Sequence, residues 1–260
     1  MLDRLLRSAG VYAVYEEWLT RQVKALPMPE HVGIILDGNR RWAWEKQMTI
    51  EDGHFMGAKV GEKLLDWTVE LGIKTLTLYV FSTENFERQS DEVKGLLKLI
   101  EGEARRLGSD RRLHSNMVRV KILGRTDLLP DSLQEALVDI EKSTKNYSNH
   151  FLNVAVAYTG RAEIVDATKK IIEDVNQGVL SSQQLDEDTF MKYLYTAHLP
   201  NPNPDLVIRT SGEERLSGFL LWQSAYSELV FVDVYWPGFR KIDFLRALRL
   251  YQRRHRRFGR

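Results

Sequence analysis

The sequence predicts an α/β fold, with a mainly parallel central sheet of about six strands flanked by helices. Short apolar runs alternate with longer segments of helical periodicity from His31 to the end of the chain. Such alternation is typical of consecutive strand–helix–strand units with right-handed crossovers. No linker, repeat or low-complexity segment interrupts the pattern. We therefore expect one domain over residues 28–260, preceded by an N-terminal helix within residues 1–27.

Six runs are short and apolar, which favours strands that are covered on both faces. They are Val32–Leu36, Lys74–Phe81, Val118–Leu123, Phe151–Ala157, Leu206–Arg209 and Leu229–Val232. The segments in which apolar residues recur every three or four positions predict helices. They are Gly53–Leu71, Glu92–Arg106, Ser132–Lys145, Arg161–Val175, Asp188–Tyr195 and Ile242–His255. The proline-rich stretch from Leu199 to Asp205 predicts a stiff loop inside the domain.

Residues 2–24 predict a separate amphipathic helix, because leucine, alanine and tyrosine side chains follow steps of three and four residues. We expect this apolar stripe to pack on the domain or on a partner subunit. The alternative is a helix that lies in a membrane interface.

The composition is that of an ordinary globular protein, with 43% hydrophobic and 28% charged residues. The net charge of +1 gives no overall field that would attract nucleic acid, so we expect no nucleic-acid partner. The chain has no cysteine, which excludes disulfides, thiolate catalysis and Cys-based zinc sites. No run of about 18 apolar residues or signal-peptide core occurs. We expect a cytoplasmic protein, with peripheral membrane contact left open.

The first polar cluster follows the strand Val32–Leu36, where Asp37 and Gly38 are followed by Asn39, Arg40 and Arg41. Ligands of open α/β sheets bind at the carboxyl ends of strands, and the N-terminus of the next helix favours an anion. A carboxylate beside a phosphate-binding turn predicts a divalent metal, since two anions would otherwise repel. The alternative is an ordinary strand–turn–helix with solvated arginines.

The second cluster ends the next strand, where Ser82, Thr83, Glu84 and Asn85 replace the apolar run and Arg88 follows. These side chains can hydrogen-bond a phosphate or polarise a substrate. They can also simply cap the next turn.

In the third cluster, a buried strand leads into Arg209, Arg215 and Ser217 around a glycine. Two guanidinium groups beside hydroxyls suit a diphosphate, whose oxygens they bind bidentately. The alternative is a structural salt bridge from Arg209 to Asp205 or Glu213.

The fourth cluster contains Glu228, a lone carboxylate among apolar neighbours that requires a partner, a metal ion or a shifted pKa. His54, which follows Gly53 at a helix start, either binds an anion or is structural. The P-loop, dinucleotide, zinc-helix and nucleophile-elbow motifs are all absent from the sequence.

Together these clusters resemble the cis-prenyltransferase family, the undecaprenyl and dehydrodolichyl diphosphate synthases, and in detail its archaeal or dolichol-type branch. The resemblance covers roughly residues 28–260 and rests on long motifs. They are His31–Ala43, the Gly53-His-x-x-Gly57 element, Leu76–Arg88, Asp205–Gln223 and the stretch from Glu228 to Pro237.

The resemblance implies a homodimeric, Mg²⁺-dependent transferase that extends an allylic diphosphate with isopentenyl diphosphate in Z configuration. It implies that Asp37 and Glu228 hold the metal and that Asp37 and Asn85 are catalytic. The substrate-binding residues that it implies are Gly38, Asn39, Arg40, Arg41, Trp42, His54, Ser82, Thr83, Glu84, Phe86, Arg88, Arg209, Arg215, Leu216, Ser217, Arg257 and Gly259. Arg257 and Gly259 match an element that reaches the partner subunit in the family.

Two positions depart from the family pattern. Ile50 stands where an arginine is common, so one contact to the allylic diphosphate is missing or comes from Arg40. Glu214 stands where bacterial members have a histidine. We expect the product to occupy an apolar tunnel with the predicted helix Glu92–Arg106 as its wall, through Leu96, Leu97, Ile100 and Ala104, although an ordinary core explains these residues equally well.

Three rival interpretations follow. The chain is a noncatalytic subunit of a heteromeric prenyltransferase, or it uses an atypical acceptor or makes a short product. A third takes the arginine-rich C-terminal segment as a nucleic-acid tail, which its interspersed leucines disfavour. Product length, allylic starter and acceptor are not fixed by the sequence.

Overall fold

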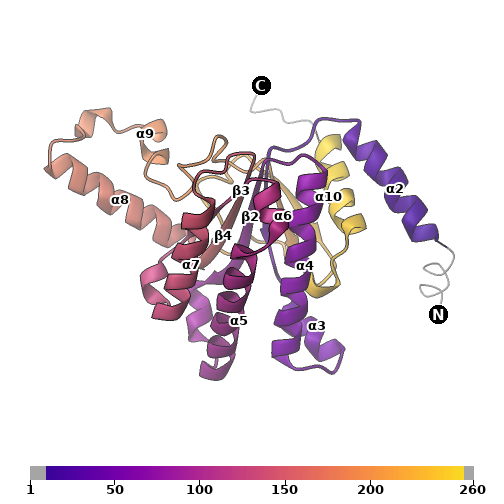
Figure 1. The fold of residues 1–260 in the computed structure, drawn as a ribbon. Coiled ribbons are helices and arrows are strands. Elements are labelled where there is room, and N and C mark those ends of the chain that lie inside the picture. The colour runs from indigo at the N-terminus through magenta and orange to yellow at the C-terminus, as the bar shows by residue number, and fades with distance from the viewer. Residues whose placement is uncertain (1–9, 255–260) are drawn as a thin grey trace.

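The computed structural model describes residues 10–254 and is built on a six-stranded sheet in which all neighbouring strands are parallel (Figure 1). The strand order is β3-β4-β2-β1-β5-β6. The strands are β1 (His31–Ile35), β2 (Thr75–Ser82), β3 (Val118–Leu123), β4 (His150–Tyr158), β5 (Leu206–Thr210) and β6 (Glu228–Val232). The predicted fold class is confirmed, and each predicted strand is present within one or two residues of its expected bounds.

Helices connect these strands. They are α2 (Val11–Lys24), α3 (Asn39–Glu45), α4 (Ile50–Glu70), α5 (Ser90–Gly108), α6 (Arg111–Ser115), α7 (Asp131–Thr144), α8 (Gly160–Asn176), α9 (Glu187–Met191) and α10 (Lys241–Arg253). Short 3-10 turns are η1 (Thr83–Glu87), η2 (Thr126–Leu128), η3 (Ser182–Gln184) and η4 (Trp236–Gly238). Helices α4, α5 and α7 stand side by side along the sheet, whereas α8 and α9 extend away from it (Figure 1).

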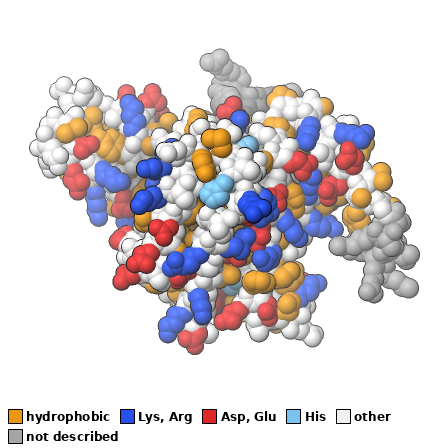
Figure 2. All heavy atoms as spheres, in the orientation of Figure 1, with side chains coloured by type: hydrophobic (Ala, Val, Ile, Leu, Met, Phe, Trp, Pro, Cys, Tyr) orange, Lys and Arg blue, Asp and Glu red, His pale blue; other side chains and the backbone are white. Residues whose placement is uncertain are grey.

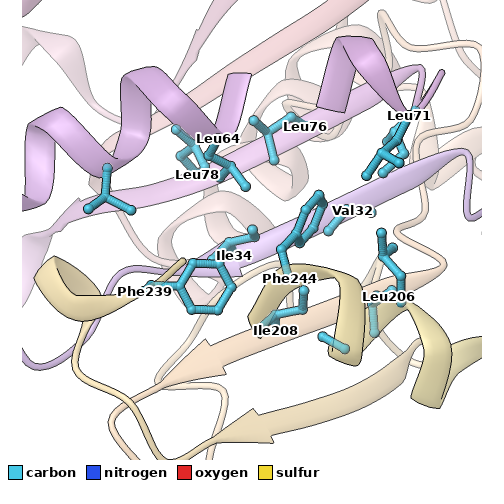
Figure 3. Close-up of a cluster of buried hydrophobic side chains, with 14 of the residues drawn as sticks. Val32, Ile34, Leu64, Leu71, Leu76, Leu78, Leu206, Ile208, Phe239 and Phe244 are labelled. Carbon is cyan, nitrogen blue, oxygen red and sulfur yellow. The ribbon is translucent and has the colours of Figure 1, made fainter. Parts of the chain in front are cut away.

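The sheet is buried on both faces because its strands are apolar in every position rather than in alternate ones. Ile34 belongs to the core under α4 and α10, while its neighbour Ile35 packs on the opposite face with Phe219 and Leu220. Figure 3 shows the first of these cores, where side chains of β1, β2 and β5 meet those of α4 and α10. The labelled residues are Val32, Ile34, Leu64, Leu71, Leu76, Leu78, Leu206, Ile208, Phe239 and Phe244.

Helix α4 begins with a capping box, in which the Thr49 hydroxyl accepts from the Asp52 amide and the Asp52 carboxylate accepts from the Thr49 amide. This box fixes the start of α4 shortly after the end of α3. Gly53 and Gly57 lie on the buried side of α4. A Cβ on Gly53 would lie 2.6 Å from the Asn39 carbonyl oxygen, so the close approach of α3 to α4 requires a glycine there.

The N-terminal helix is shorter than predicted. Gly10 has a left-handed backbone with φ of 69° and serves as the N-cap of α2, so a helix continuous from residue 2 to residue 24 is wrong. Residues 2–9 lie outside the described part of the chain. The predicted packing on the domain is confirmed, because Leu19 and Val23 are fully buried and α2 contacts α10.

Two further helices differ from expectation. The predicted helix Asp188–Tyr195 is the short α9 (Glu187–Met191), followed by turns. The short α6 was not predicted, because five residues are too few for a periodicity. The last helix, α10, ends at Arg253, and His255 lies outside the described residues. Within residues 10–254, no helix combines the length and apolar character that crossing a membrane would require.

Candidate active site

The carboxyl ends of β1, β2 and β5 lie next to one another and carry the polar clusters noted in the sequence. Gly38 follows β1 with φ of 99° and is the N-cap of α3. A Cβ at Gly38 would lie 2.7 Å from the Tyr235 ring, so only glycine fits this turn. The turn brings Arg40 and Arg41 into the first turn of α3, as predicted.

Asp37 is the centre of the first charged group. Its Oδ2 accepts hydrogen bonds from Arg209 Nη2 at 2.7 Å and Nε at 3.3 Å, and its Oδ1 accepts from Arg41 Nη2 at 3.2 Å. Arg209 also donates to Ser217 Oγ at 2.7 Å. Arg41 donates to Ser211 Oγ at 2.8 Å and to Glu213 at 3.0 Å. Two arginines from different elements therefore converge on one carboxylate.

These contacts keep Asp37 ionised at neutral pH. Burial favours the neutral acid, but the hydrogen bonds and charge of Arg209, with Ser211 and Arg41, outweigh it and lower the pKa of Asp37 below its usual value. The alternative that Arg209 forms a salt bridge with Asp205 or Glu213 is wrong. Arg209 pairs with Asp37, while Asp205 accepts from the backbone amides of Glu30 and His31.

A second charged group forms around Glu92, near the start of α5. Its carboxylate accepts from Arg88 Nη1 at 3.0 Å and lies 3.7 Å from Arg40 Nε and 3.7 Å from His54 Nε2. The side chain of Glu92 is 8% exposed and that of His54 is 11% exposed. Three basic side chains from α3, α4 and the η1 end thus surround one buried carboxylate.

His54 is neutral in this setting. Burial is the main cause that lowers its pKa, and the nearby positive charge of Arg88 lowers it further. Its Nε2 and the Asn39 Oδ1 are buried atoms without a hydrogen-bond partner in the described structure. Unpaired buried polar atoms are costly and mark places where a ligand completes the hydrogen bonding.

The loop after β2 is held by its own side chains. Asn85 Oδ1 accepts from the Ser82 amide at 3.1 Å, which closes a capping box over η1. The alternative that these polar side chains cap the turn after β2 is therefore confirmed. It does not exclude a role in binding, because Ser82, Glu84, Asn85 and Arg88 also line the main cavity.

A cavity of about 730 Å³ extends from these polar side chains into the space between the sheet and α4, α5 and α7. Its inner walls are apolar, and their side chains are Leu65, Leu78, Val80, Leu96, Leu99, Ile100, Ala104, Leu107, Val120, Ile122, Leu137, Ile140, Leu152 and Val154. Of the four predicted tunnel residues on α5, Leu97 packs in the core beneath α7 rather than on the cavity.

A smaller pocket of about 610 Å³ adjoins the polar end of this cavity. The two share Leu36, Asp37, Asn39, His54 and Arg88, and the smaller one adds Gly38, Arg40, Arg41, Trp44, Met48 and Ile50. Arg40 and Ile50 therefore line the same pocket. This position is compatible with the expectation that Arg40 supplies the contact of the arginine that is common in the family at position 50.

Some predicted site residues do not line either hollow. Trp42, Thr83, Phe86, Arg215 and Leu216 are absent from both linings. Phe86 packs edge-on against Phe81 with ring centroids 4.9 Å apart, and Arg215 is exposed and paired with Glu213. Arg257 and Gly259 lie outside the described residues.

Glu228 requires a correction. It is the first residue of β6, paired in register with Leu206 and, through β5, with Val32 at the start of β1. Asp37 follows the other end of β1, so one ion cannot bind both carboxylates of a single chain. Glu228 instead accepts from Arg254 Nη1 at 3.0 Å.

The sequence reasoning missed Glu92 as a site residue. Charged residues on an amphipathic helix are usually solvated, so the pattern gave no reason to single it out. The available signal was the spacing of Arg88 and Glu92, which are four residues apart and form an ion pair.

Comparison with known proteins agrees with this geometry. The Prenyltransf family model, whose description reads "Putative undecaprenyl diphosphate synthase", matches residues 35–259. The chain belongs to this family. A Pyrococcus furiosus relative named tritrans,polycis-undecaprenyl-diphosphate synthase (geranylgeranyl-diphosphate specific) is 53% identical, with 96% of this chain and 94% of that protein covered. The Methanocaldococcus jannaschii protein of the same name is 50% identical, with coverages of 98% and 91%.

A solved structure extends the comparison to the fold. Lavandulyl diphosphate synthase from Lavandula x intermedia, in complex with dimethylallyl diphosphate, superimposes with a TM-score of 0.85 at 35% identity. The match covers 90% of this chain and 99% of that one. This prenyltransferase therefore has the cis-prenyltransferase α/β fold, and its enzyme class is that of its relatives.

Proposed function

We propose that this prenyltransferase condenses isopentenyl diphosphate with an allylic diphosphate to make a polyprenyl diphosphate with Z double bonds. The observation that carries the proposal is the position of the Asp37–Arg41–Arg209 group at the polar end of a long apolar cavity. Guanidinium groups suit a diphosphate head, and the apolar walls suit a growing hydrocarbon tail. The names of the two archaeal relatives favour geranylgeranyl diphosphate as the starter and tritrans,polycis-undecaprenyl diphosphate as the product.

The residues present fit a Mg²⁺ ion shared with the substrate. No group of three or more carboxylate, histidine or cysteine side chains that could hold a metal occurs among residues 10–254. Mg²⁺ commonly binds through one or two carboxylates, waters and substrate phosphates, and the ionised Asp37 supplies such a carboxylate. When bound, the ion would neutralise the charge that develops on the departing diphosphate.

The side chains then divide the remaining work. Arg40, Arg41 and His54 are proposed to bind the allylic diphosphate, because they surround the smaller pocket with Asn39. Arg88, Arg209 and Ser217 are proposed to bind isopentenyl diphosphate at the main cavity. Asn85 is proposed to orient the group that loses a proton, because its amide is fixed through the Ser82 bond and an amide is not itself a base at neutral pH.

Labelled isopentenyl diphosphate tests this proposal directly. We expect incorporation with geranylgeranyl diphosphate in Mg²⁺, and loss of incorporation when EDTA exceeds Mg²⁺. Shorter starters, including farnesyl and dimethylallyl diphosphate, should react more slowly. No extension of any allylic starter would contradict the proposal.

A second candidate function is the use of an atypical acceptor, which the fold match with lavandulyl diphosphate synthase favours. It predicts a short product from dimethylallyl diphosphate alone. The same assay without isopentenyl diphosphate decides between the two, because only the second candidate then gives a product.

The active form is proposed to be a homodimer in which the C-terminal tail serves the partner. Arg254 is tied to Glu228 at the edge of the sheet opposite Asp37. Five strand residues span about 16 Å, whereas the three residues from Arg254 to Arg257 reach at most about 10 Å. This geometry favours a tail that serves Asp37 of a second chain.

Peripheral membrane contact is proposed at the mouth of the smaller pocket. Trp44 is 82% exposed there, and Met48, Ile50, Phe55 and Met56 are also exposed. Exposed apolar clusters beside basic residues are typical of interfacial contact. Trp44→Ser should reduce co-sedimentation with phosphatidylglycerol vesicles, whereas the exposed Val179→Ser on the α8–α9 connection should not. Equal binding by both variants would contradict this site.

A further inference from the structure

One buried carboxylate lies between the two diphosphate subsites proposed above. Glu92 contacts Arg40 of the allylic subsite and Arg88 of the isopentenyl subsite. It also contacts His54, which belongs to the allylic subsite. Glu92 is not part of the Mg²⁺ site proposed for Asp37. A buried carboxylate at the boundary of two anion-binding sites calls for an explanation, because it repels the ligands of both.

The three contacts of Glu92 end on one oxygen atom, Oε1, but they differ in kind. Arg88 Nη1 donates a hydrogen bond to this atom at 3.0 Å. Arg40 Nε and His54 Nε2 both lie 3.7 Å from it, which is beyond hydrogen-bond distance. Glu92 therefore fixes Arg88 by a hydrogen bond and acts on the other two side chains without one. Their nitrogen atoms remain available to a ligand.

Glu92 lies in the layer behind these basic side chains. All three line the cavity or the smaller pocket, whereas Glu92 lines neither. A diphosphate that enters therefore contacts the basic side chains and not the carboxylate. With His54 neutral, two guanidinium groups and one carboxylate present a single net positive charge to the ligand.

The burial of Glu92 makes its charge effective over a distance. On the face of the molecule in Figure 2, acidic and basic side chains are interspersed at the surface, where water and salt screen them. The side chain of Glu92 is only 8% exposed. Because a buried charge is screened much less, Glu92 opposes the binding of a diphosphate several ångströms away.

The proposed reaction requires the diphosphates to move. A bond forms between C1 of the allylic substrate and C4 of isopentenyl diphosphate, the allylic diphosphate leaves with the electron pair of its C1–O bond, and C2 of the isopentenyl unit loses a proton to solvent. The freed diphosphate must then leave. The product carries the diphosphate of the isopentenyl unit, which must pass to the allylic subsite before the next condensation. Tight ground-state binding would slow both moves without accelerating the chemical step.

We propose that Glu92 is a shared counter-charge that limits how tightly both subsites hold a diphosphate. It fixes Arg88 in the free enzyme and reduces the positive charge that a ligand meets. A diphosphate can therefore leave, or pass between the subsites, after each condensation. Glu92 acts through the three basic side chains and does not touch the substrate, so it is a positioning residue. The inference rests on the proposed prenyl transfer.

The affinity for inorganic diphosphate in Mg²⁺, measured by titration calorimetry, tests this role without turnover. Glu92→Gln keeps the length of the side chain and an oxygen that accepts from Arg88, but it removes the charge. We expect the Kd for diphosphate to fall about 3–10-fold, the scale of one partly screened charge several ångströms away. The KM for both substrates should also fall, and steady-state turnover should fall because release is slower. A merely structural role predicts the opposite sign, since disordered basic side chains bind diphosphate more weakly.

Three variants serve as controls. Glu92→Asp retains the charge and should keep the Kd close to that of the wild type. Asp91→Asn removes the same charge from the same first turn of α5, but its side chain is fully exposed and lines neither hollow. Glu101→Gln breaks an ion pair with Arg105 that has the same four-residue spacing farther along α5. The last two should leave the Kd unchanged.

Circular dichroism and the melting temperature check the fold of every variant. If Glu92→Gln does not fold, Glu92→Met takes its place, because it removes the charge at nearly the same length. An unchanged or weaker affinity in the folded neutral variant overturns the inference, as does an equal gain in Asp91→Asn. A wild-type protein that binds diphosphate but extends no allylic diphosphate contradicts the proposed function instead, so the two failures are distinguishable.

Discussion

At the scale of single residues, the site is organised by two carboxylates, each of which holds several basic side chains in place. Asp37 is the common acceptor for Arg41 and Arg209, and Arg209 is only 5% exposed. A carboxylate that both orients two guanidinium groups and remains ionised is suited to a metal and a diphosphate together. Glu92 organises Arg40, His54 and Arg88 in the same way at the neighbouring pocket.

Replacement of Asp37 by asparagine should lower turnover by about 10²–10⁴-fold, the scale of losing a main electrostatic contact. The amide keeps the size of the side chain and part of its hydrogen bonding to Arg209, so the protein should remain folded. Incorporation of labelled isopentenyl diphosphate measures the loss, and circular dichroism checks the fold. Full turnover by the folded variant would show that Asp37 is not needed.

Arg215 gives a separate prediction, because it is exposed and paired only with Glu213 in the described structure. The resemblance assigns it to isopentenyl diphosphate. Loss of one charge-assisted phosphate contact costs about 1.5–3 kcal/mol, so Arg215→Ala should raise the KM for isopentenyl diphosphate about 10–100-fold. The KM for the allylic starter should hardly change. A similar rise for both substrates would remove Arg215 from a dedicated isopentenyl site.

At the scale of elements, a buried polar chain ties the strands together at the edge opposite the site. His31 Nε2 on β1 lies 2.7 Å from Thr77 Oγ1 on β2, and Thr77 accepts from Asn153 on β4 at 2.9 Å. His31 Nδ1 faces the Asn201 carbonyl at 3.1 Å. His31 is fully buried, and burial lowers its pKa to about 4.

The protein should lose stability in mild acid through His31. Its pKa in the folded state is about 4, below the ordinary value of 6.5. Between these values the unfolded chain binds the proton and the folded chain does not, so stability falls as the pH falls through this range. Between pH 7 and pH 5 the loss should be about 2 kcal/mol. Urea unfolding of wild type and His31→Gln near pH 7 and near pH 5 measures it. Equal pH dependence in both proteins would contradict this assignment.

The sequence predicted the strands and most helices better than it predicted which side chains meet at the site. Buried parallel strands read as continuous apolar runs, so β1 and β5 were predicted nearly to the residue. The separation of Glu228 from Asp37 was missed although the sequence contained it: Glu228 comes before its predicted strand, whereas Asp37 follows one, and in a parallel sheet these positions lie at opposite ends of the strands. Glu92 was missed for another reason. Its partners Arg40, His54 and Arg88 lie on other segments, and only the fold brings them together.

At the scale of the whole molecule, the parallel sheet places the diphosphate-binding candidates and the C-terminal segment at opposite ends of its strands. All diphosphate-binding candidates within residues 10–254, except Glu228, follow the carboxyl edge of the sheet. The last described residues lie at the other edge, where Arg254 meets Glu228 (Figure 1). We therefore propose that Arg257 acts on the site of a second subunit.

Mixing two inactive chains tests this arrangement. A chain truncated after Arg254 should still dimerise but have impaired activity, and Asp37→Ala should be inactive. Their heterodimer contains one intact site, because the truncated chain supplies Asp37 and the other chain supplies Arg257. We expect partial recovery of activity on mixing. Heterodimers that form without any recovery would show that the tail does not act on the partner.

The cavity between the sheet and α4, α5 and α7 also governs how the protein responds to heat. Its walls are apolar, so we expect apolar molecules that fit the cavity to bind the folded state in preference to the unfolded chain. Such binding raises stability by mass action, about 2.7 kcal/mol when the ligand is at 100 times its Kd. The melting temperature of this protein is therefore not a constant of the chain. We expect it to rise with the concentration of a long-chain alcohol that binds in the cavity, even though such a molecule carries no phosphate.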